Sequence, residues 1–183
     1  NDAVVQQASG YISNHPGLKD ARCVGNIGIQ PDPDGQVRSV PLLSQWQQAT
    51  SPLLPLAMLQ CGSNHPVDVS TLSSRLFSQP FWEVPFPRNW QAYTVVPAQD
   101  VLGHRVDPQW LRERWVLVGS SALGLSDRAT TPLGESVAGV MVHAAVLTAL
   151  LDQVENPPGA RWEPLGKAIA SAWILLSLGV MGW

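Results

Sequence analysis

A long stretch that is apolar on almost every side sets the strongest constraint on how this chain can fold. The segment SVAGVMVHAAVLTALLD, residues 136–152, predicts one helix. Only His143 and Thr148 interrupt its apolar surface in the middle. A helix that is apolar nearly all round has to be covered on most sides by other elements. We therefore expect this helix at the centre of a domain.

The segment WVLVGSS, residues 115–121, predicts a buried strand that ends in a small polar loop. A fully apolar run is typical of a strand covered on both faces. Ligands of α/β proteins bind just beyond the carboxyl ends of such strands. The loop and the helix after it contain the candidate ligand-binding residues, which are Ser120, Ser121, Asp127, Thr131 and His143.

His143 has two interpretations. A buried polar side chain needs a partner, so this histidine is either a satisfied core residue or a group that faces a ligand. The structural role is the more common of the two.

The same loop departs from two catalytic motifs. Leu125 stands where a phosphate-binding P-loop requires lysine. Leu123 stands where a nucleophile elbow requires its second glycine. The order Ser121, Asp127, His143 imitates a hydrolase triad, although these residues are closer along the chain than in such folds. We therefore expect no catalysis by this chain and keep an envelope serine hydrolase as an alternative.

The segment GNIGIQPDPDGQVRSVPLL, residues 25–43, predicts an antiparallel hairpin. Apolar residues alternate on both sides of PDPDG, and an Asp-Gly pair accepts the positive φ of a tight turn. Asp32 and Asp34 also suggest calcium, but the further oxygen ligands of a calcium loop are missing. Turn chemistry accounts for both aspartates, and we expect neither a metal nor a cofactor.

Several shorter elements are predicted around these units by caps, prolines and glycines. They are a helix over 51–62 with Ser51 as cap and Pro52 at its first position, a small helix at 75–77, a strand over 91–96, a helical turn over 97–102 closed by Gly103, and a short helix opened by Asp107 and Pro108.

The C-terminal part predicts a membrane segment. Residues 168–183 carry no charged side chain, and a spanning helix needs about 20 mostly apolar residues. We interpret 165–183 as the start of a transmembrane helix and 156–164, with its Pro-Pro-Gly, as a linker. A buried C-terminal helix is the alternative. Residues 1–155 then form one domain, and the polar opening without a signal-peptide pattern suggests that this domain is truncated at its N-terminus.

Composition narrows the class of protein further. Only 14% of the residues are charged, against roughly 25% in an average soluble protein, which favours a membrane connection. The 11 basic residues are scattered, which argues against nucleic-acid binding. The two cysteines, Cys23 and Cys61, are interpreted as separate buried thiols rather than a disulfide.

Two segments in the correct order resemble the CHASE domain of type 2, a family whose acronym stands for cyclases/histidine kinases associated sensory extracellular. The resemblance covers about residues 10–152. The matching positions are Asp32, Asp34, Gly35, Val37 and Arg38 in the first segment, and Gly119, Ser121, Ala122, Asp127, Thr131, Pro132, Gly139, Val140, His143 and Ala144 in the second.

The resemblance implies a mixed α/β fold, with an antiparallel hairpin and a buried strand-loop-helix unit, followed by a transmembrane helix. It implies an extracytoplasmic sensory input domain of a bacterial membrane receptor whose cytoplasmic output is a cyclase or a kinase. We expect an unidentified small-molecule or ion ligand, a membrane location and a homodimer. A module that only dimerises its receptor, without sensing a ligand, is the further alternative.

Overall fold

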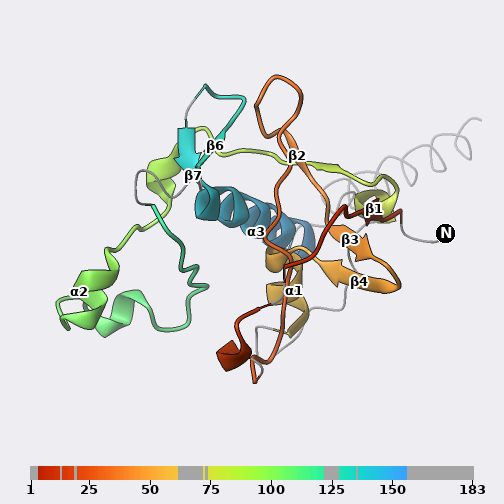
Figure 1. Cartoon of the computed structure of the whole chain (residues 1–183). Coiled ribbons are helices and arrows are strands. Elements are labelled where there is room, and N and C mark those ends of the chain that lie inside the picture. Colours follow the sequence, from red (N-terminus) through yellow and green to blue (C-terminus); the bar gives the residue numbers. More distant parts are fainter. Residues whose placement is uncertain are drawn as a thin grey trace, which may run out of the picture.

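A computed structural model describes residues 4–12, 14–18, 20–61, 72, 74–121, 128–134 and 136–155. Three small sheets and two longer helices make up this part of the chain, so the fold is of the mixed α/β class that the sequence predicts (Figure 1). The strands are β1 (Gln6–Gln7), β2 (Ser39–Val40), β3 (Leu43–Trp46), β4 (Ala49–Pro52), β5 (Trp82–Glu83), β6 (Arg128–Thr130) and β7 (Ser136–Ala138).

The core lies between the helices α3 (Gly139–Glu155) and α1 (Leu54–Cys61), which pack against each other. Figure 1 shows α3 in blue across the middle of the molecule, with α1 next to it. Val142, Val146 and Leu150 lie along α3 at intervals of four residues and are fully buried. The prediction of a central buried helix is therefore confirmed, although residues 136–138 form β7 instead of its first turn.

β3 is the middle strand of the largest sheet. It pairs in parallel with β1 and in antiparallel fashion with β4, which places Ser51 opposite Ser44 and Pro52 opposite Leu43. The predicted helix over 51–62 is confirmed from Leu54 onward, but its predicted capping is wrong because Ser51 and Pro52 belong to β4. Proline is tolerated there because β4 is an edge strand, where its missing N–H breaks no ladder.

The tight turn predicted at PDPDG is confirmed, whereas its two arms do not pair as a hairpin. Gly35 has φ +81°, and the Asp32 amide donates to the Gln36 carbonyl at 2.8 Å. After the turn, however, Val37 donates to the carbonyl of Thr130, and Val40 pairs with Trp82 of β5. The antiparallel hairpins of the described structure are β3–β4 and β6–β7.

Residues 115–118 belong to no strand, so the prediction of a strand buried on both faces is wrong. Leu117 packs against the core, whereas Val116 is 49% exposed and Val118 is 89% exposed. Of the four residues, only Leu117 thus packs against the core. The strand predicted over 91–96 is also wrong, since this region contains the 3₁₀ turn η4 (Trp90–Ala92), capped by the Asn89 side chain.

The remaining short helices, with one exception at Pro16–Leu18, follow their sequence signals. The described turns are η1 (Pro16–Leu18), η3 (Ser74–Phe77), α2 (Ala98–Leu102) and η5 (Pro108–Trp110). Gly103 ends α2, and the Asp107 side chain caps η5 by accepting from the Gln109 amide at 2.9 Å. The predicted helices at 75–77, 97–102 and 107–108 are therefore confirmed.

Cys23 and Cys61 form a disulfide, with their Cα atoms 6.3 Å apart, so the prediction of two separate thiols is wrong. The distance is within the usual range for a disulfide. The same segment also contacts the other end of α1. A Cβ atom on Gly25 would lie 2.5 Å from the Leu54 Cα, and the Leu54 amide donates to the Asn26 carbonyl. Residues 23–26 are thus fixed to α1 at both of its ends.

The predicted linker over 156–164 and the predicted membrane segment over 165–183 lie outside the described residues. Among the helices that the structure describes, none combines the length and the apolar character needed to cross a bilayer.

Candidate functional site

The loop after residues 115–118 lies against the first turn of α3. A Cβ atom on Gly119 would be 2.5 Å from the Cβ of Val140, so the two backbones can approach only because residue 119 has no side chain. Ser120 and Ser121 follow directly, the first half-buried and the second exposed. His143 lies one turn beyond Val140 on the same helix. The structure therefore brings this polar loop to the end of α3 that carries His143.

Thr131 lies at the end of β6 that is farther from α3, because Arg128 pairs with Ala138 and Thr130 pairs with Ser136. It follows β6, which pairs with β7, and β7 continues directly into α3. Thr131 is 0% exposed and His143 is 7% exposed, so both side chains belong to the interior in this conformation. Each takes part in a noncovalent interaction within the structure. This burial favours the structural interpretation of His143.

Asp127 lies outside the described residues, so the structure places only part of the predicted site. The described members of this polar group are Ser120, Ser121 and His143, near the N-terminal end of α3, and Thr131, at the end of β6. Ser121 alone among them is exposed. Because Ser121 is the exposed member, a ligand would have to approach from the side of the two serines.

The two aspartates of the PDPDG turn are paired with Arg38. One guanidinium nitrogen of Arg38 lies 2.8 Å from Asp32 and 2.9 Å from Asp34, and the other lies 2.6 Å from Asp34. The hydrogen bonds from Arg38 and from the Gln36 amide lower the pKa of Asp34 to about 2. The same ion pairs raise the pKa of Arg38. The two aspartates therefore neutralise the Arg38 guanidinium and hold the turn closed.

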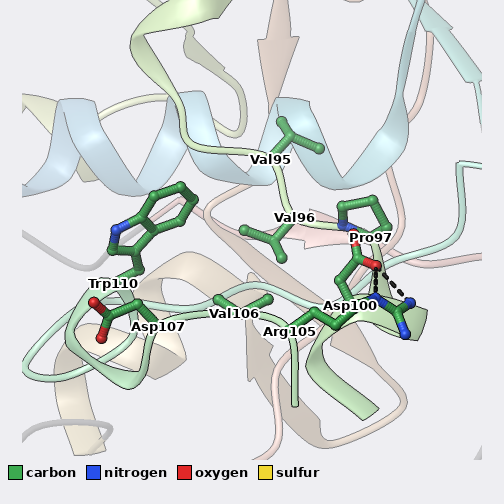
Figure 2. A pocket seen from close by; sticks show the side chains of 8 residues that line it. All are labelled: Val95, Val96, Pro97, Asp100, Arg105, Val106, Asp107 and Trp110. Atoms are coloured by element: carbon green, nitrogen blue, oxygen red, sulfur yellow. Dashed lines mark hydrogen bonds and ion pairs between the residues drawn. The ribbon is translucent and has the colours of Figure 1, made fainter. Parts of the chain in front are cut away.

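An open hollow of about 420 Å³ lies apart from this group, and sequence reasoning missed it (Figure 2). Its lining comes entirely from one stretch of chain, from Val95 to Trp110. Val96 and Val106 lie in the middle, with Trp110 at one end in Figure 2 and the Asp100–Arg105 ion pair at the other. The Arg105 guanidinium donates to Asp100 through two nitrogens, at 2.9 and 2.6 Å.

The signals at the ends of α2 and η5 identified helices, but nothing in the sequence showed that these short elements enclose a space. The volume is within the range of small-molecule sites, although the hollow is open to solvent and three of its eight lining residues are charged. In the part of the chain that the structure describes, no three or more histidine, cysteine or acidic side chains gather as metal ligands would.

Comparison with known proteins gives one match. The family model described as "CHASE2 domain" matches residues 2–183, which extends the resemblance beyond residues 10–152 to nearly the whole chain. No curated protein and no solved structure matches the chain significantly.

Proposed function

Because the chain belongs to the CHASE2 domain family, which is a family of sensory extracellular domains, we propose that it is the input domain of a bacterial transmembrane receptor. The family is sensory and not catalytic, which argues against the envelope hydrolase. In this proposal the domain lies outside the cytoplasm, and a cyclase or kinase on the other side of the membrane gives the output.

The observation that carries the proposed mechanism is the contact between Gly119 and Val140. It couples the loop to the first turn of α3, while the β6–β7 hairpin enters the same turn through the backbone. A ligand that binds one arrangement of the loop more tightly would shift the population of α3 positions. The candidate ligand contacts are Ser120, Ser121, Asp127, Thr131 and His143.

The disulfide between Cys23 and Cys61 supports the extracytoplasmic location. Disulfides persist in oxidising compartments and are rare in the cytosol. We further propose that residues 156–164 link this domain to a transmembrane helix that begins at about residue 165. α3 ends at Glu155, so such a linker would follow the central helix directly.

Ligand sensing can be tested by measuring the unfolding temperature of the complete sensory domain. The measurement is repeated in the presence of each compound in a panel of envelope metabolites and ions. A ligand that binds only the folded state raises the unfolding temperature. Asp127→Asn and Thr131→Val should remove that rise, whereas Thr50→Val, at an exposed position, should retain it. No response to any compound would contradict the ligand-sensing proposal.

Signal transmission needs a separate measurement. We propose a homodimer, and a spin label at the exposed position 152 near the end of α3 would report the distance between two copies. A stabilising ligand should change this distance. An unchanged distance with a bound ligand would contradict transmission through α3 without contradicting binding.

A module that only dimerises its receptor is the second candidate function. It is favoured by the exposed apolar side chains in residues 95–118, which include Val95, Leu102, Trp110 and Val118. Where such side chains form one contiguous patch, they are typical of protein contact surfaces. A constitutive dimer that is weakened by Val118→Ser, and that no compound in the panel affects, would support this candidate over a ligand sensor.

A further inference from the structure

We propose that the hollow between Val95 and Trp110 binds a small organic cation, an amine with an apolar body, at the end formed by Trp110 and Asp107. This inference concerns binding alone and shares no residue with the loop and helix group described above. It can therefore hold or fail independently of the proposed sensory mechanism.

The middle of the hollow is suited to the apolar body of a ligand. Val95, Val96 and Val106 line it together with Pro97. Figure 2 shows the side chains of Val96 and Val106 between the two polar ends. Covering these side chains with an apolar group would remove hydrocarbon surface from water, which is the main favourable term in such sites.

The charges around the hollow favour a cation. Arg105 is its single basic residue, and it is already paired with Asp100 at one end. Asp107 at the other end accepts one hydrogen bond, from the Gln109 amide at 2.9 Å, and no other partner of its carboxylate lies in the described chain. A carboxylate has room for several hydrogen bonds. An ammonium group can therefore bind to Asp107, whereas an anion would be repelled.

Trp110 is positioned to contact the same cation. Its amide donates to the Asp107 carbonyl at 3.0 Å, which closes the 3₁₀ turn η5. Asp107 and Trp110 both line the hollow. Trp110 is 61% exposed, so its indole ring is available to a ligand. A cation near the face of an indole ring is attracted by the electrons of the ring.

The Asp107 position is fixed before any ligand arrives. Asp107 is the cap of η5, and Pro108 restricts the first residue of the turn. A carboxylate and an aromatic ring held on one rigid turn lose little freedom on binding, which increases affinity. This preorganisation distinguishes the Trp110 end of the hollow from the more exposed side chains elsewhere in residues 95–118.

The test is calorimetric titration of the purified full chain, in nanodiscs of neutral phosphatidylcholine, with three probes that share a phenylethyl body. They are phenethylammonium, neutral 2-phenylethanol and anionic 3-phenylpropionate, and empty nanodiscs correct for partition into lipid. We expect phenethylammonium to bind about fivefold or more tightly than the alcohol, and the anion not to bind. Equal binding of all three probes, or no binding of the cation, would overturn the proposal.

Two variants test the residues. Asp107→Asn keeps a good helix cap and removes the charge, and Trp110→Leu keeps apolar volume and removes the ring. Each should weaken phenethylammonium about fivefold, while Asp152→Asn, an exposed carboxylate on α3, should have no effect. Unfolding temperatures confirm that the variants fold. If Asp107→Asn folds and keeps the wild-type affinity, the inference is wrong, whatever Trp110→Leu does.

Discussion

Gly119 lies so close to Val140 that a methyl group on residue 119 would be 2.5 Å from the Val140 Cβ. Gly119→Ala should therefore push the loop away from α3 and lower the free energy of unfolding by about 1–3 kcal/mol, the usual cost of overpacking. Chemical denaturation of the variant measures this loss. Gly10→Ala is the control, because nothing lies within 4 Å of the Cβ position at Gly10. Equal stability of the two variants would show that the contact is not needed.

The disulfide between Cys23 and Cys61 should stabilise the domain by closing a long loop. The two residues are 38 positions apart, and its removal should cost about 2–4 kcal/mol in the free energy of unfolding. The measurement compares the wild type with the Cys23→Ala/Cys61→Ala variant, with and without reductant. Reductant should destabilise the wild type and leave the double variant unchanged. A wild type that is insensitive to complete reduction would contradict a stabilising disulfide.

The ion pair between Asp34 and Arg38 should make stability depend on pH in the acid range. The pKa of Asp34 is lowered from 3.8 to about 2, so the contribution of its carboxylate is present above 3.8 and lost as the pH falls toward 2. Asp34→Asn should therefore be less stable than the wild type at about pH 5, and the difference should shrink toward pH 2. Unfolding temperatures of the wild type and of Asp34→Asn across this pH range test the prediction. A stability difference that does not depend on pH would contradict it.

The packing of α3 against α1 should carry much of the stability. Leu150 is 0% exposed, and Leu150→Ala should lower the free energy of unfolding by about 2–5 kcal/mol through lost burial and a residual cavity. Leu102 is 81% exposed, and the same substitution there should stay within about 0.5 kcal/mol of the wild type. Denaturation of both variants gives the comparison. Similar losses in the free energy of unfolding at Leu150 and Leu102 would show that the packing of α3 against α1 does not carry much of the stability.

Features that depend on neighbouring residues could be predicted from the sequence. The positive φ of Gly35, the end of α2 at Gly103 and the cap of η5 at Asp107 all follow from the chemistry of one turn. The central helix could also be predicted, because its apolar surface is continuous over several turns. These signals require no knowledge of what lies beside the element.

Features that depend on distant partners could not be predicted in the same way. Val37 was expected to pair across the PDPDG turn, but its partner is Thr130, far along the chain. The apolar run at 115–118 was expected to be covered on both faces, yet only Leu117 contacts the core. The pairing of Cys23 with Cys61 depends in the same way on where α1 ends.

The candidate site was predicted only in part for the same reason. Ser120 and His143 were grouped from their order in the sequence, and the contact between Gly119 and Val140 brings their segments together. The hollow at Val95–Trp110 was missed because its lining comes from short turns without a period. Its acidic residues, Asp100 and Asp107, are explained equally well in the sequence as ordinary helix-end residues.

The bridge between Gln36 and Thr130 has a consequence for how the protein is made. Val37 and Leu150 belong to the same core although they are far apart in the sequence, so this core is complete only after both have been synthesised. The complete core can therefore form only after α3 has left the ribosome. Contacts between such distant positions also form slowly, because a long loop must close first. Export in an unfolded state is thus compatible with the order in which the elements appear.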